Sequence, residues 1–143
     1  MVATQPDTHR AYVVATAEAG KHALVEKPMA RAAAEADAMV EAHEKAGTVL
    51  AVCSQHRFRA SPLAALKLIQ DGSIGTLRMI RAQGTVTQEE AETAEPDNEP
   101  YADMGFHVLD LLRGFVGAPA TIAFGQQASF REPPPRGSTM ALY

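Results

Sequence analysis

Short apolar segments alternate with helical segments over the first 53 residues of the chain. Three apolar segments have the composition of strands: residues 2–3, 22–25 and 48–53. Two segments between them have helical spacing and end at a glycine: residues 8–19 and 32–46. This alternation predicts an α/β fold in which a parallel sheet is joined by right-handed helical crossovers. Three strands are few for an open sheet of this kind, so we expect further strands upstream.

The two predicted helices should each turn one apolar face toward the sheet. In the first helix the recurring apolar residues are Ala11, Val14, Ala15 and Ala19. In the second helix one face holds Ala36, Met39, Val40 and His43. Asp7 or Thr8 is the expected N-cap of the first helix. The segment 48–53 is continuously apolar, which is typical of a strand buried on both faces.

After Arg57 the pattern changes, and we predict a first domain of residues 1–56 and a second of residues 57–143. Ser61 and Pro62 are expected to begin a helix that ends near Gly72. The other predicted elements are a strand at 76–87, an exposed acidic loop at 88–100, a helix at 103–115, and strands at 120–130 and 138–143.

Charge and cysteine content exclude several classes of protein. The chain has 13 basic and 17 acidic residues, a net charge of -4, and no basic stripe, which argues against nucleic acid as a partner. Cys53 is the only cysteine, so no disulfide framework is available, and a reducing compartment fits. No apolar run approaches the ~18 residues of a membrane span, and no signal peptide is visible. We therefore expect a cytoplasmic protein without membrane contact.

Glu26-Lys27-Pro28 follows the apolar strand predicted at residues 22–25. Open α/β sheets bind ligands at the carboxyl edge of their strands, and Lys27 should lie at that edge. A partly desolvated lysine there can hydrogen-bond a substrate hydroxyl and stabilise negative charge on its oxygen. Pro28 restricts the backbone beside it. The tripeptide by itself also fits a surface lysine beside a turn, which is the simpler reading.

Asp103, His107 and Asp110 are spaced so that a helix would carry all three on roughly one face. A carboxylate and an imidazole placed in this way can bind a polyol or move a proton near neutral pH. The alternative makes Asp103 a helix N-cap, with a satisfied histidine one turn later. A metal site is disfavoured because no second imidazole is nearby, so we predict none.

Two further segments lie where a strand ends. The segment from Thr4 to His9 opens a helix, so its backbone amides could face a dinucleotide with His9 near the nicotinamide. A capped helix start with an exposed histidine is the alternative. In the segment from Gln55 to Phe58, Arg57 could form an ion pair across the interface between the lobes, or contact a substrate or phosphate.

In this order and spacing, these pieces resemble the Gfo/Idh/MocA family, which includes glucose-fructose oxidoreductases and inositol dehydrogenases. The matching stretches are ATQPDTH, AGKHALVEKPMA, EADAMVEAHEKAG, SQHRFRASP, IQDGSIGTLRMIRA and DMGFHVLDLL. The resemblance implies the C-terminal half of a Rossmann-type parallel sheet, followed by a partial α+β substrate domain with an open sheet. Family members often pair face to face through that open sheet, so the resemblance leaves a homo-oligomer through the sheet open, without fixing the oligomeric state.

The resemblance also implies an activity and a set of site residues. It implies NAD or NADP as cofactor, and hydride transfer between the nicotinamide and a sugar, polyol or related secondary alcohol. Lys27 would contact the substrate hydroxyl, His107 would accept its proton, and Asp103 would orient the substrate. These side chains would then converge on one pocket. The residues expected to border the cofactor are Thr4, Pro6, His9, Glu26, Lys27 and Pro28.

The sequence departs from the family pattern in three places. It contains no Gly-x-Gly-x-x-Gly turn, whose helix N-terminus would hold the pyrophosphate. Family members also continue beyond Tyr143, so we expect a chain truncated at both ends. Gln55-His56 stands where members often carry asparagine before an arginine-phenylalanine pair. A competing prediction is therefore a non-catalytic fragment that is inactive alone.

Overall fold

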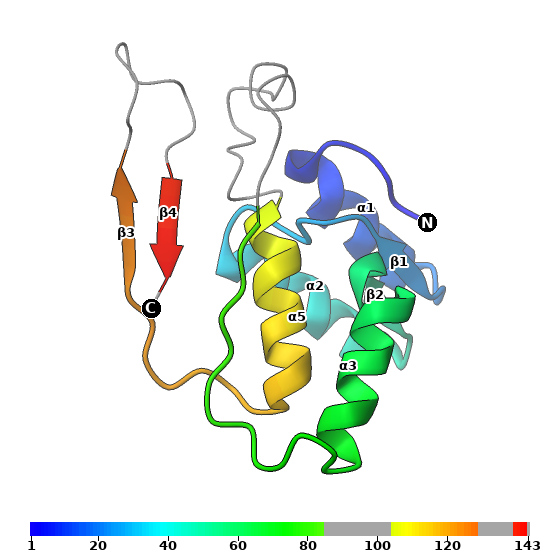
Figure 1. Cartoon of the computed structure of the whole chain (residues 1–143). Helices are drawn as coiled ribbons and strands as arrows, with labels where there is room; N and C mark the ends of the chain where they lie inside the picture. Colours follow the sequence, from blue (N-terminus) through cyan, green and yellow to red (C-terminus); the bar gives the residue numbers. More distant parts are fainter. Residues whose placement is uncertain (85–103, 129–138, 143) are drawn as a thin grey trace. The chain divides into compact units, whose positions relative to one another are not determined.

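The computed structural model of the chain describes residues 1–84, 104–128 and 139–142 (Figure 1). These residues fall into two compact units, Met1–Ser54 and Gln55–Tyr143. We call them the first and the second unit and describe each by itself. No helix within the described ranges is long and apolar enough to cross a membrane.

The first unit consists of alternating helices and strands around a small parallel sheet. Its elements are α1 (Pro6–Glu18), β1 (Ala23–Val25), α2 (Ala33–Ala46) and β2 (Leu50–Val52). Strands β1 and β2 are parallel, with Ala23 opposite Leu50 and Val25 opposite Val52. On the other side of β1, Val2 forms a parallel bridge with Val25. The predicted parallel sheet with helical crossovers is confirmed.

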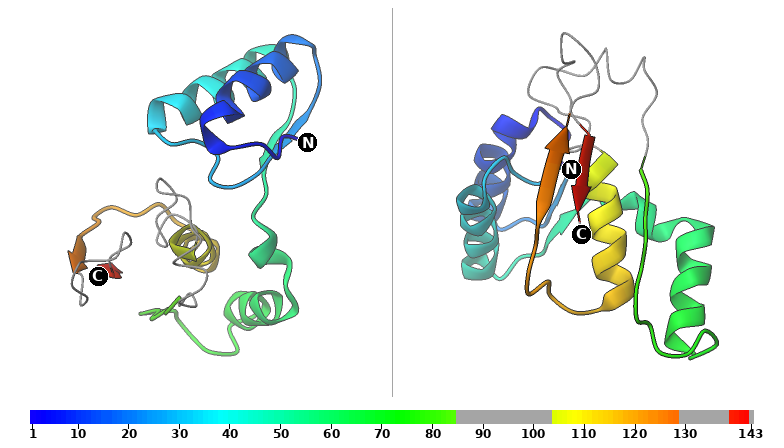
Figure 2. Two further views of the ribbon diagram at one scale, coloured as in Figure 1. Left: turned by 90° about the horizontal axis from the view of Figure 1, so that it is seen from above. Right: turned by 60° about the vertical axis from the view of Figure 1, so that its left-hand side comes forward.

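Both helices of the first unit cover the same face of the sheet. The two crossovers step across the sheet in one direction, and α1 and α2 lie side by side (Figure 2). The core between helices and sheet contains Val13, Ala23, Val25 and Met39. The middle residue of β2, Ala51, is exposed. The prediction that residues 48–53 are buried on both faces is therefore wrong, because the helices of this unit cover only one face.

Helix α1 begins two or three residues earlier than its polar residues suggested. It starts at Pro6, whose ring presets a helical φ, and Gln5 is the N-cap residue without a side-chain capping bond. The prediction of Asp7 or Thr8 as N-cap is wrong. The Thr8 hydroxyl instead donates to the Gln5 carbonyl at 2.8 Å inside the first turn.

The buried face of α1 also differs from the predicted one. The buried residues are His9, Val13 and Ala17. In an alanine-rich helix the spacing of small apolar residues fits more than one face, so the pattern did not choose between them. Helix α2 buries Met39 and His43 as predicted, whereas Val40 is exposed.

The described residues of the second unit include three helical elements and an antiparallel strand pair. The helical elements are η1 (Gln55–Phe58), α3 (Ala60–Gln70) and α5 (Phe106–Val116). Strands β3 (Gly125–Ala128) and β4 (Thr139–Leu142) pair with each other. These strands fall within the predicted segments 120–130 and 138–143, although residues 120–124 lie outside β3.

The segment 76–84 is not the strand that its alternating pattern predicted. A strand exists only when a neighbour completes its hydrogen bonds, and alternation in the sequence supplies no partner. The segment instead approaches the start of α5: a Cβ added at Gly84 would lie 2.6 Å from Met104 Cγ and 3.1 Å from Val108 Cγ2. Residues 85–87, the predicted loop 88–100 and Asp103 lie outside the described residues.

Candidate functional site

The carboxyl ends of three parallel segments meet at one edge of the first unit. The Glu26 amide donates to the Val2 carbonyl at 2.9 Å, and the Cys53 amide donates to the Val25 carbonyl at 2.8 Å. The residues that follow Val2, Val25 and β2 therefore leave the sheet side by side. This is the edge at which open α/β sheets bind ligands.

Glu26 is held in place at this edge by its neighbours. Its carboxylate accepts the Lys27 amide at 3.2 Å. The Cys53 thiol, which follows β2, donates a hydrogen bond to the same side chain. This bond, together with burial and the negative charge of Glu26, raises the pKa of the Cys53 thiol. This interaction connects the side chains that follow β1 and β2.

His9 lies inside this edge and joins two segments of main chain. It is completely buried. Its Nδ1 lies 3.1 Å from the Pro28 carbonyl and 3.3 Å from that of Met29, and its Nε2 lies 3.0 Å from the Thr4 carbonyl. The alternative of an exposed histidine is therefore wrong. Because its ring nitrogens face carbonyl oxygens of this unit, His9 connects the start of α1 to the chain after Lys27.

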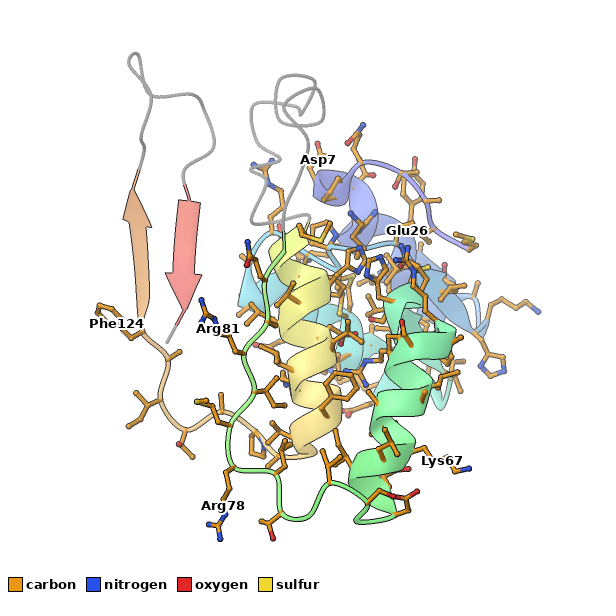
Figure 3. All side chains as sticks on the ribbon, viewed as in Figure 1. Asp7, Glu26, Lys67, Arg78, Arg81 and Phe124 are labelled. Carbon is orange, nitrogen blue, oxygen red and sulfur yellow. The ribbon has the colours of Figure 1, made fainter. Side chains whose placement is uncertain are left out.

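The six residues predicted to border a cofactor gather at this edge. Thr4 and Pro6 lie where α1 begins, and the hydroxyl oxygens of Thr4 and Thr8 lie 2.7 Å apart. Glu26 and Lys27 follow β1, and the Lys27-Pro28 peptide bond is cis. Figure 3 labels Asp7 in the first turn of α1 and Glu26 at the end of β1. Contact of these residues with a cofactor stays a prediction.

A second group of polar side chains joins η1 to α5 in the second unit. The His56 ring stacks on the His107 ring, with centroids 3.9 Å apart and planes 6° apart. The next residue, Arg57, binds both carboxylate oxygens of Asp110 at 2.6 Å. His107 is 6% exposed, and the Phe106 ring lies edge-on against it at 5.6 Å. Consecutive residues of η1 thus bind residues one turn apart on α5.

The Arg57–Asp110 pair corrects one prediction about this group. Arg57 was expected to form an ion pair between the lobes or to contact a ligand, but its partner belongs to the same unit. The hydrogen bond to Asp110, together with the charge of Asp110, raises the pKa of Arg57. Asp110 therefore serves this pair, while Asp103, the predicted substrate carboxylate, lies outside the described residues.

The His56–His107 contact was missed by sequence reasoning. The only sequence signal was the imidazole of His56 next to Arg57. Nothing in the neighbouring residues indicates which helix that ring packs against. Among residues 1–84, 104–128 and 139–142, no group of three or more His, Cys, Asp or Glu side chains could hold a metal ion.

Comparison with known proteins assigns the first unit, with its parallel sheet, to a family. Residues 1–54, which make up the first unit, match the Gfo/Idh/MocA family, described as an oxidoreductase family with an NAD-binding Rossmann fold. The first unit therefore belongs to the Gfo/Idh/MocA oxidoreductase family.

Individual relatives match over most of this chain. D-apiose dehydrogenase of Paraburkholderia graminis is 33% identical over 120 residues, covering 81% of this chain and 32% of that protein. Levoglucosan dehydrogenase of Pseudarthrobacter phenanthrenivorans is 33% identical over 130 residues, with the same two coverages. The structure of an oxidoreductase from Agrobacterium radiobacter in complex with NAD+, L-tartaric acid and magnesium is similar with a TM-score of 0.77 and 26% identity. It covers 97% of this chain and 42% of that one. The chain thus spans about a third of the length of these two curated relatives.

Proposed function

We propose that this chain contributes to an NAD(P)-dependent oxidoreductase that acts on a secondary alcohol of a sugar or polyol. The observation that carries the proposal is Lys27 at the carboxyl edge of the parallel sheet, in a unit that matches the NAD-binding family. The relatives named above support the substrate class, since apiose and levoglucosan are the compounds in their names.

The residues at the carboxyl edge of the first unit fit the nicotinamide half of NAD or NADP. The ammonium of Lys27 and the hydroxyl of Thr4 can bind polar atoms of the cofactor or substrate, and Pro6 and Pro28 offer apolar surface beside them. Glu26 fixes the start of the Lys27 segment through the Lys27 amide. His9 supports the edge from inside. When bound, the cofactor supplies the hydride acceptor.

The chain's own residues would supply positioning and proton transfer. Lys27 would hydrogen-bond the substrate hydroxyl oxygen and stabilise the negative charge that develops on it. The hydroxyl O–H bond breaks and its proton passes to a ring nitrogen of His107. A bound oxidised nicotinamide would accept the hydride from the alcohol carbon, so that loss of the proton to His107 and of the hydride together would leave a carbonyl compound. Asp103 would orient the substrate.

The test is to assay the chain with NAD+ and with NADP+ against a panel of aldoses, anhydrosugars and polyols, following reduced cofactor. Lys27→Ala should lower kcat by about 10²- to 10⁴-fold, the usual range for loss of such a group. Cofactor affinity, measured by fluorescence titration, should change far less. Lys21→Ala removes an exposed lysine of the same unit and is the matched control.

Two outcomes would overturn the proposal. If Lys27→Ala turns over substrate as fast as the wild type, Lys27 does not contact the reacting hydroxyl. If the wild-type chain binds neither cofactor at millimolar concentration, the competing prediction of a non-catalytic fragment is favoured.

A further inference from the structure

We propose that His56 is a positioning residue for His107, and that the close stack of the two rings disfavours a positive charge on His107, so that His107 is neutral when it meets the substrate. This inference rests on the proposed role of His107 as proton acceptor. The observation behind it is the nearly parallel stack of the two imidazoles at 3.9 Å.

The contacts around the two rings fix their orientation. On one side, Arg57 binds Asp110 through two parallel hydrogen bonds to its carboxylate and a third, at 3.1 Å, to its carbonyl oxygen. This clamp holds η1 against α5 at the residue next to His56. On the other side, the ring of Phe106 lies edge-on to His107 with an interplanar angle of 72°. His107 is thus held by a face contact and an edge contact, and it has little freedom to turn.

The short separation of the rings couples their titration. Two imidazolium ions at this distance repel each other, so protonation of one ring disfavours protonation of the other. A proton on His56 therefore favours the neutral form of His107. A neutral imidazole is the form that can take a proton from an alcohol.

The other charged groups of the second unit that the structure describes lie on or beside η1, α3, α5 and the segment 76–84. Asp110, one turn along α5, is bound by Arg57, so its charge is already paired. The remaining described cations of the second unit are Arg59 between η1 and α3, Lys67 on α3, Arg78 and Arg81 on segment 76–84, and Arg113 on α5. The remaining described carboxylate, Asp71 at the end of α3, accepts the Ser73 amide. Figure 3 shows Lys67, Arg78 and Arg81 directed away from α5. Among the groups described here, the His56 ring is the titratable neighbour that stacks directly on His107.

The experiment is a pH titration of the histidine ring protons of the whole chain by NMR, without cofactor or substrate. It compares the wild type with His56→Asn, which has neither a ring nor a titratable group, and with His56→Phe, which keeps a ring but cannot be protonated. His22→Asn, at an exposed histidine of the first unit, is the matched control.

Both His56 variants should raise the titration midpoint of His107, because the repulsion is lost. The expected rise is roughly one pH unit, from unit charges about 4 Å apart. His56→Phe should also keep the ring-current shift of the His107 signals, which His56→Asn should lose. The His22 variant should leave His107 unchanged. If His107 titrates at the wild-type pH in both His56 variants, the proposal is overturned. The NMR signals of α5 show whether each variant keeps its fold, and the result is taken from a variant that keeps them.

A second measurement separates this inference from the proposed function. In the turnover assay, His56→Asn should move the acidic limb of the kcat–pH profile upward by the same shift as the NMR midpoint, with kcat nearly unchanged at high pH. If the NMR coupling is present but this limb does not move, His56 does not act through His107 and the positioning role fails. Failure of the oxidoreductase proposal would appear elsewhere, as unaltered turnover in Lys27→Ala.

Discussion

The two units bury their histidines in different ways. Among the described residues, the buried polar side chains are His9 and His43 in the first unit and His107 in the second. His9 faces three backbone carbonyls. His43 uses Nε2 on the Val13 carbonyl at 3.2 Å and Nδ1 on the Thr48 hydroxyl at 2.7 Å. In contrast, His107 meets the ring of another histidine.

This difference shows that burial alone does not identify a reactive histidine. The groups that contact the buried ring are more informative. His9 and His43 connect main-chain segments, since each bonds a carbonyl of a distant part of the first unit. Removing them should cost folding free energy. His107 stacks on a side chain that can itself be protonated, so a change in its neighbour should alter its titration before it alters stability.

The largest expected effect is on the stability of the first unit. His9→Ala should lower its free energy of unfolding by about 3 kcal/mol, because a buried ring that contacts three backbone carbonyls is lost and a cavity remains. His22→Ala should cost less than about 1 kcal/mol, because His22 is exposed and only accepts the Val49 amide at 2.9 Å. Urea unfolding followed by amide signals of residues 1–54 measures both. Equal losses would mean that the backbone contacts of His9 do not support this unit.

Two glycines, Gly114 inside α5 and Gly117 directly after it, test how tightly η1 is packed in the second unit. Gly114→Ala should stabilise the unit by about 0.5–1 kcal/mol, because alanine favours helix interiors. Its Cβ would lie 3.6 Å from Arg57 Cζ, an ordinary contact. Gly117→Ala should destabilise by about 1 kcal/mol, because Gly117 has a φ of 69°. Unfolding followed by α5 signals measures both. A loss in Gly114→Ala would show that the Arg57–Asp110 contact leaves no room.

The smallest expected effect concerns the contact between the side chains of Cys53 and Glu26 in the first unit. Glu26 raises the pKa of the thiol, so Glu26→Gln should lower that pKa and speed alkylation at neutral pH by less than about tenfold. The rate of iodoacetamide labelling, followed by mass spectrometry, measures this. Glu35→Gln is the control, since Glu35 bonds the Arg31 amide instead. An unchanged rate would show that Glu26 does not hold the thiol.

The same contact has a defined effect of pH on folding. The pKa of the folded thiol lies above its unfolded value, so the protonated form is stabilised by folding. That contribution is complete below the ordinary cysteine pKa and is lost as pH rises through the raised value. In Glu26→Gln this alkaline loss of stability should be smaller.

Local sequence signals predicted the first unit better than the second. Gly20 and Gly47 end the helical segments where the structure has positive φ, and the apolar segments became β1 and β2. These signals act over a few residues, so the sequence shows them directly. The segment 76–84 has alternating apolar and polar residues, which is also a strand signal. Strand formation depends on a hydrogen-bonding partner, however, and this alternation does not specify one.

The candidate site divides in the same way. Lys27 was placed at the carboxyl edge because a strand end and a parallel topology follow from the sequence pattern. His9 was assigned to the right segment, but its burial depends on how the chain after Lys27 folds back over α1. The stack of His56 on His107 joins residues 51 positions apart, counted as 107 minus 56, and no local pattern reports such a contact.

By itself the sequence determined the order of helices and strands in the first unit, the parallel sheet, and the edge that carries Glu26 and Lys27. It could do so because propensity, spacing and crossover handedness are properties of short segments. Only the tertiary structure decided which histidines bond to backbone carbonyls and which one stacks on another ring. Those contacts depend on the distances between elements after packing, and they set the chemistry of each imidazole.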